Sequence, residues 1–327
     1  MSKQIGVLGA AVTVAAAVAF VLTWSSGFLV PAIAADVPPL SLLVWRFVPL
    51  AVVLLAVTML TGAARGLTRA DLGRQALIGL CAQFGYCVAV YAAIASGVAT
   101  GTTALIDAVQ PLVVAALVGP LLGLRVRGAQ WAGLVVGALG VLLVVRSQLE
   151  GSRADLWAYA WPVIAMACLV VGTFVQRRSA VQTGTLVTLT IHVTVTAVAL
   201  VPVAALFGAL VPPASASFWL AVGFAAVFPT LCAYGLYWWL LRRVGVTALN
   251  ALLFLVAPAT AVAGTALFAE PLTAVTLAGL ALCAAGVALV LLGEGRTPPT
   301  ASPQAREGAA SWPEDSREHP MGTAPRR

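Results

Sequence analysis

The chain has 327 residues, of which 61% are hydrophobic and only 9% are charged, and its mean hydropathy is +1.02. Because a soluble domain carries about 25% charged residues, this composition excludes water as the surroundings of most of the chain. The formal net charge of +7 comes from basic residues in short loops and in the C-terminal tail. That distribution is better explained by membrane orientation than by nucleic-acid binding.

The apolar runs are long enough to cross a bilayer, since one helical crossing needs roughly 20 apolar residues. They are apolar on all sides, whereas barrel strands alternate polar and apolar residues, so we predict an all-α membrane protein. A signal peptide is the alternative for the first run, because Ala32-Ile33-Ala34 resembles a cleavage site. The run is too long for that, and the repeat described below requires it as a helix. Ten transmembrane helices are predicted, at Ile5–Trp24, Pro38–Leu60, Gln75–Ala95, Val98–Leu122, Gly128–Val145, Trp157–Gln176, Thr183–Ala209, Ser217–Leu240, Val246–Phe268 and Thr273–Gly293.

Basic residues divide the predicted loops into two unequal sets. Alternation from a cytoplasmic start puts ten of them inside the cell and only Arg146 and Arg153 outside, which is a strong positive-inside bias. Both termini are therefore expected in the cytoplasm. Segment 295–327 is rich in Pro, Ser, Ala and charge, and we predict a disordered cytoplasmic tail there. The five cysteines lie in apolar runs without CxxC spacing, so neither a disulfide framework nor a metal site is predicted.

The second half of the chain repeats the first at a shift of 146 residues. Residues 132–144 and 278–290 agree at eight of thirteen positions, and Gly133 and Gly140 align with Gly279 and Gly286. We predict five-helix repeats at residues 1–150 and 151–294. Because five is odd, the second repeat must enter the membrane from the opposite face. Such inverted repeats are typical of secondary transporters, which bind substrate near the midplane between the halves.

Several motifs accompany the repeat, namely Trp24-Ser25-Ser26-Gly27-Phe28, Trp45-Arg46-Phe47, Pro111, Pro258, Glu270-Pro271-Leu272-Thr273, Gly279 and Gly286. Together with the ten spans, they resemble the EamA branch of the drug/metabolite transporter superfamily. The resemblance covers about Ile5 to Gly293, and it implies a ten-helix, five-plus-five transporter of small organic molecules in a bacterial inner membrane. In that family the Glu-x-Leu-Thr turn usually recurs in both halves, whereas here Glu270 faces Leu124 in the first copy, which indicates a structural role for Glu270.

Three ionisable residues lie inside predicted spans, where a charge is costly. Asp107 is a candidate to bind a cationic group or to carry a coupled proton, and its alternative is a structural pair with Arg46. Arg46 can hold an anionic substrate group or extend toward the interface. His192 aligns with Arg46 at the 146 shift and can titrate, or it can be a buried histidine bonded to a carbonyl or a neighbouring threonine.

Polar and helix-breaking residues complete the candidate site. Pro111 and Pro258 each free the carbonyl four residues earlier and kink their helices, or they serve packing alone. Asn250 can hydrogen-bond across helices. Gly133-x-x-x-Gly137 favours close helix packing and a homodimer. The remaining candidates to line the cavity are Gln83, Tyr86, Tyr91, Tyr237 and Trp24.

The sequence lacks a Walker loop and the HExxH and GxSxG motifs. We therefore expect neither ATP-driven transport nor enzymatic activity, and no cofactor. The expected function is secondary transport of an amino-acid-like or drug-like metabolite by alternating access, as export by proton antiport. An uncoupled facilitator or an importer is the alternative, and an intramembrane enzyme or a receptor comes from a different class.

Overall fold

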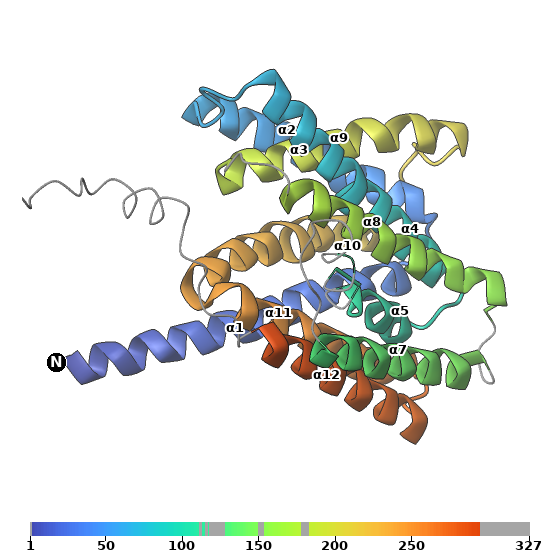
Figure 1. The fold of residues 1–327 in the computed structure, drawn as a ribbon. Helices are drawn as coiled ribbons and strands as arrows, with labels where there is room; N and C mark the ends of the chain where they lie inside the picture. The colour runs from blue at the N-terminus through green and yellow to red at the C-terminus, as the bar shows by residue number, and fades with distance from the viewer. Residues whose placement is uncertain are drawn as a thin grey trace, which may run out of the picture. The chain divides into compact units, whose positions relative to one another are not determined.

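Helices joined by short loops make up the described chain, and no strand occurs in it (Figure 1). The computed structural model describes residues 2–110, 113–114, 117, 128–149, 154–177 and 183–294. Residues Met1–Gly293 form one compact unit. The first repeat contains α1 (Ser2–Ile33), α2 (Pro39–Thr61), α3 (Arg69–Gly79), the π-helix η1 (Leu80–Gly85), α4 (Tyr86–Ala95), α5 (Thr100–Asp107) and α7 (Gly128–Leu149). The second contains the 3₁₀ turn η2 (Leu156–Tyr159), α8 (Ala160–Arg177), α9 (Thr185–Leu206), α10 (Ala216–Ala226), the π-helix η3 (Val227–Cys232), α11 (Ala233–Phe268) and α12 (Ala274–Glu294).

Six helical stretches of the described residues are long and apolar enough to cross a membrane. Shorter apolar helices occur in α7, in the second part of α11 and in α12. Ten spans therefore remain a prediction, although the all-helical membrane architecture is confirmed. The first helix is longer than predicted and continues past Trp24 to Ile33. Pro111 and the tail 295–327 lie outside the described residues.

Local sequence explains where several helices begin and end. α2 starts with Pro39, which suits the first helical turn because its missing N–H would have no partner there. It ends at Gly62, whose φ of 62° is the left-handed conformation that glycine adopts without steric cost. Thr68 and Asp71 then form a capping box at the start of α3, in which each side chain accepts from the other's backbone N–H.

A π-helical turn interrupts the corresponding helix of each repeat. η1 and η3 each contain six residues, and their bounds differ by 147 positions. The starts of α3 and α10 show the same offset, so the extra residue lies in the loop after α9, which contains Pro212-Pro213. A uniform shift of 146 would align Tyr91 with Tyr237, but with the offset of 147 in this region Tyr91 corresponds to Trp238. Turns of this kind are rare and often occur at functional sites.

α11 has two arms that pack against the same turn of α1. Tyr234 packs on Trp24, with ring centroids 5.5 Å apart, and the Val256 carbonyl accepts a hydrogen bond from Ser25 Oγ at 3.3 Å. A straight helix would separate positions 234 and 256 by about 33 Å, so α11 folds back between them (Figure 1). Its arms correspond to the eighth and ninth predicted spans.

The repeats meet through helices that pack antiparallel on their own counterparts. In α7 and α12, a methyl group on Gly140 would lie 2.7 Å from the Gly279 carbonyl oxygen, and one on Gly286 would lie 2.6 Å from that of Gly133. The 146-residue shift exchanges these two contacts, so an approximate two-fold axis relates the two helices, which lie side by side in Figure 1. The Gly133-x-x-x-Gly137 motif thus packs within the chain, as close helix packing predicted. Thr58 and Thr190, whose hydroxyls are 2.7 Å apart, join α2 to α9.

Candidate functional site

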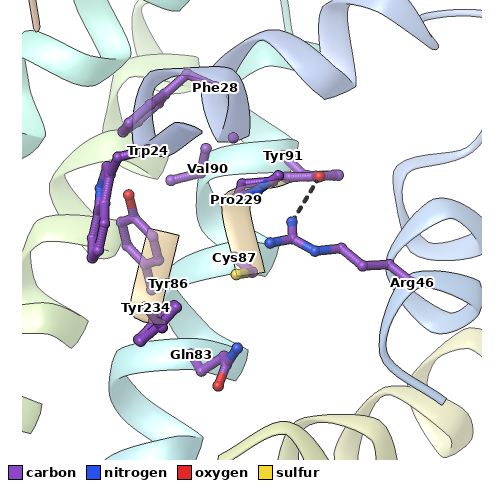
Figure 2. Close-up of a pocket in the computed structure, with 11 residues that line it drawn as sticks. Trp24, Phe28, Arg46, Gln83, Tyr86, Cys87, Val90, Tyr91, Pro229 and Tyr234 are labelled. Atoms are coloured by element: carbon purple, nitrogen blue, oxygen red, sulfur yellow. Dashed lines mark hydrogen bonds between the residues drawn. The ribbon is translucent and has the colours of Figure 1, made fainter. Parts of the chain in front are cut away.

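A cavity lies where α1, α2, η1 and α4 of the first repeat meet η3 and α11 of the second (Figure 2). Its volume is about 40 Å³, measured as the space that the centre of a water molecule can occupy. One water needs at least about 10–15 Å³ on this measure, so the cavity can hold a few waters or a small polar group. Its walls are Trp24, Gly27, Phe28, Arg46, Gln83, Tyr86, Cys87, Val90, Tyr91, Pro229 and Tyr234.

Arg46 is the cationic group of the cavity, and its side chain is 4% exposed. Nη1 donates to the Tyr91 hydroxyl at 2.9 Å (Figure 2), and Nε and Nη2 both donate to Thr230 Oγ1 at 3.1 and 2.8 Å. A guanidinium has five N–H groups, so two remain without an acceptor among the described residues. The guanidinium also lies 4.8 Å from the centre of the Phe47 ring.

Thr230 connects Arg46 to the π-helix of the opposite repeat. It accepts two hydrogen bonds from the guanidinium and donates its own to the carbonyl of Ala225, five residues earlier. That five-residue spacing belongs to the wide π turn, which places the hydroxyl beside α2. The described contacts therefore fix Arg46 between Tyr91 of the first repeat and Thr230 of the second.

Asp107 reaches the cavity through Tyr86. The Tyr86 hydroxyl donates to Asp107 Oδ2 at 3.1 Å, whereas Oδ1 is buried and accepts from none of the described groups. Gln83, in the preceding turn, is 1% exposed, and its Oε1 also has no partner in the described part of the chain. Asp107 and Arg46 do not pair with each other, so the predicted alternative of a structural ion pair is wrong. Arg46 bonds to Tyr91 and Thr230, and Asp107 bonds to Tyr86.

Aromatic rings form the wall opposite Arg46. The Trp24 ring packs on Phe20, Tyr234 and Tyr237, with centroids between 5.4 and 6.0 Å apart. Trp24 and Tyr234 line the cavity directly, and Tyr237 stands behind Trp24. Tyr237 is therefore a support for the wall, because the one-residue offset between repeats turns it away from the position of Tyr91.

His192 lies apart from the cavity walls. Its Nε2 is 3.0 Å from Gln75 Oε1, and both side chains are buried between α9 and α3. A methyl group on Gly79 would lie 2.9 Å from the His192 Cα, so α3 and α9 are in close contact there. The prediction of a buried, hydrogen-bonded histidine is confirmed, with glutamine as its partner instead of a carbonyl or threonine. Pro258 lies inside α11, and the side chain of Asn250 lies outside the described residues.

The amino-acid sequence matches the EamA-like transporter family twice, over residues 11–146 and 156–292. The chain belongs to the EamA-like transporter family. The two matches confirm the internal repeat, and together with the apolar helices they establish a multi-pass membrane protein of a transporter family. A solved structure titled only "Crystal structure of protein" is similar in fold, with a TM-score of 0.58 and 23% identity over 88% of this chain and 99% of that one. No curated protein matched the sequence.

In this EamA-like chain, five of the predicted site residues come together at one cavity, namely Trp24, Arg46, Gln83, Tyr86 and Tyr91. Sequence reasoning missed Pro229 and Thr230. The corrected shift of 147 would have found Thr230, because it pairs that residue with Gln83, which was already a candidate. The cavity offers hydrogen-bond donors on a fixed cation, flat apolar walls and a nearby carboxyl group, which is the chemistry of a binding site for a small organic molecule.

Proposed function

We propose that this EamA-like chain is a secondary transporter that moves a small, amino-acid-like metabolite across the cytoplasmic membrane by alternating access. The main support is Arg46, a buried cation that bonds to residues of both repeats. Two of its five N–H groups have no acceptor among the described residues. An uncompensated buried charge is costly, and the carboxylate of a substrate would compensate it with paired hydrogen bonds. The aromatic wall would then contact the apolar part of the substrate.

Contacts between helix ends support ten spans with both termini in the cytoplasm. Arg243, between the two arms of α11, donates to Thr13 at 2.8 Å and to the Gly9 carbonyl at 3.3 Å, which puts the end of the eighth span beside the N-terminal half of the first. Glu270 accepts from the backbone N–H of Thr100 at 2.8 Å, which puts the end of the ninth span beside the start of the fourth. Alternation assigns the first pair to the inner face and the second pair to the outer face. Each contact therefore joins residues that this topology places together.

Asp107 is the proposed carrier of the coupled proton. One of its oxygens accepts from Tyr86, which lines the cavity, and the other is buried without a described partner. A proton on that second oxygen would remove a buried charge, and Tyr86 would let the occupied cavity sense that change. In the proposed cycle, Asp107 takes a proton from outside, releases it inside, and the substrate leaves the cell. An uncoupled facilitator or an importer remains the alternative.

Flux in proteoliposomes tests this proposal. A panel of amino acids would be loaded under an imposed pH gradient, and the chain would be compared with Asp107→Asn, which keeps the shape of the side chain but holds no exchangeable charge. We expect gradient-driven flux in the original chain and only exchange without a pH response in the variant. Flux that is independent of the gradient in the original chain would indicate a facilitator, and unchanged proton-driven flux in the variant would contradict the role of Asp107.

A further inference from the structure

The turn between α11 and α12 reaches across to the opposite repeat and caps α5. Glu270 Oε1 accepts from the backbone N–H of Thr100 at 2.8 Å, and Oε2 accepts from the Thr100 hydroxyl at 3.0 Å and from the Gly101 N–H at 3.4 Å. The residue before α5 is Ala99, whose side chain cannot accept a hydrogen bond. A carboxylate from the second repeat therefore does the work that a local capping residue normally does for the first turn of a helix.

The backbone around the Glu270 carboxylate is so closely packed that two neighbouring glycines could not carry a side chain. α11 ends at Phe268 and is followed by Ala269, whose φ of 54° is a left-handed conformation that is uncommon for residues other than glycine. A methyl group on Gly264 would lie 2.6 Å from the Thr100 hydroxyl oxygen and would collide with the Glu270 carboxylate. A methyl group on Gly101 would lie 2.8 Å from the Ala261 Cα. The two repeats thus touch backbone to backbone at this end of α5.

The two-fold relationship predicts a second such contact on the opposite face, but the sequence does not supply it. The first-repeat counterpart of Glu270-Pro271-Leu272-Thr273 is Leu124-Arg125-Val126-Arg127, which contains no acidic residue. A carboxylate cap between the repeats is therefore encoded for one face only. By the proposed topology, that face is the outer one.

We propose that Glu270 is a one-sided latch that holds the outer ends of the two repeats together and makes the outward-closed state the resting state of the protein. This inference rests on the proposed alternating access, in which the outer ends must separate once in each cycle. α5 runs from the latch at Thr100 to Asp107 at its other end, so separation at the latch displaces the helix that bears the proposed proton carrier. With the outer face closed at rest, the cavity is accessible first from the cytoplasm, as an exporter requires.

The native Cys87 provides a reporter, because it lines the cavity. Sealed vesicles would be treated with a membrane-impermeant maleimide from the outside, and labelling of each cysteine would be read by peptide mass spectrometry. Loss of the hydrogen bonds to one charged group changes the equilibrium between the outward-closed and outward-open states on the order of tenfold. We therefore expect Glu270→Gln to raise external labelling of Cys87 about tenfold, and Gly264→Ala to have the same effect because its methyl group takes the place of the carboxylate.

Two controls make the result decisive. Asp155→Asn removes another acid from the predicted outer face, one whose described contact is with Trp157 in its own loop, and it should leave the labelling unchanged. Cys283, buried between α7 and α12, should stay unlabelled as long as the protein is folded. The latch would be overturned if Glu270→Gln left the external labelling of Cys87 unchanged. It would also be overturned if the variant raised labelling equally when the maleimide was applied from the inside. Glu270 would then be a static cap. Flux decides the proposed function separately, since latch-dependent labelling in a chain that moves no substrate would overturn transport alone.

Discussion

Arg46 and His192 occupy the same position in the two repeats, but they have different partners. Arg46 faces the cavity and bonds to Tyr91 and Thr230, whereas His192 bonds to Gln75 between α9 and α3. Both positions are polar in the middle of an apolar helix, where an unpartnered group is costly. The repeats thus share the place of a polar side chain and differ in its surroundings, since Arg46 lines the cavity and His192 lies between two helices.

Replacing Arg46 should weaken substrate binding without unfolding the protein. Arg46→Lys keeps the charge but loses the flat, paired donors that match a carboxylate, so we expect affinity to fall by about tenfold, the effect of losing one strong charged hydrogen bond. Arg46→Gln should weaken binding further. Substrate-induced thermal stabilisation in detergent measures the change, and Arg65→Lys in the loop after α2 is the control. Equal affinity in all three variants would exclude Arg46 from the site.

Thr230 should affect substrate binding by holding the Arg46 side chain in place. Thr230→Val keeps the volume of the side chain but removes the acceptor of two guanidinium hydrogen bonds, and a buried donor left unpaired costs about 1–3 kcal/mol. We expect weaker binding of carboxylate substrates together with a lower Tm. Thr230→Ser restores the hydroxyl and should recover the affinity, and a serine variant as weak as the valine variant would contradict a role of the Thr230 hydroxyl through Arg46.

His192 should contribute to stability and not to substrate affinity. His192→Phe leaves the Gln75 amide buried without its described partner, so we expect a loss of about 1–3 kcal/mol in the free energy of unfolding. Adding Gln75→Leu removes the unpaired group and should recover most of that loss. Thermal unfolding and the KM of transport report the two effects, and a KM change of His192→Phe with unchanged stability would contradict this assignment.

The glycine contact between α7 and α12 should tolerate no added methyl group. Gly140→Ala and Gly286→Ala each drive a methyl group against backbone of the opposite helix, and overpacking of this kind costs about 1–3 kcal/mol. Gly223→Ala, in α10, meets no atom within 4 Å and should leave the Tm unchanged or slightly higher. Equal Tm values for the three variants would contradict the close packing.

The helices were predictable because the bilayer imposes one rule, a long apolar run for each crossing. The same rule explains why Arg46, Gln83, Tyr86 and Tyr91 line the cavity, since a polar group in an apolar helix must face the protein interior. Thr230 escaped notice because a helical threonine can bond back to its own helix and so reveals no need for a partner. The π turns were not predicted either. A methyl group on Gly85, the last residue of η1, would lie 2.8 Å from Cys168 Sγ in α8, and a contact between segments so far apart is not visible in the local sequence.

Three helix pairs, α2 with α9, α5 with α11 and α7 with α12, join a helix to its own counterpart. A surface that binds its own copy in antiparallel orientation is self-complementary. A polypeptide of the first half alone would therefore carry most of what it needs to assemble with a second molecule inserted the other way up. Because its two copies are identical, such an ancestor-like pair would be the same on both sides of the membrane. Differences that arose after duplication, Glu270 among them beside Arg46 and His192, give the present chain a front and a back.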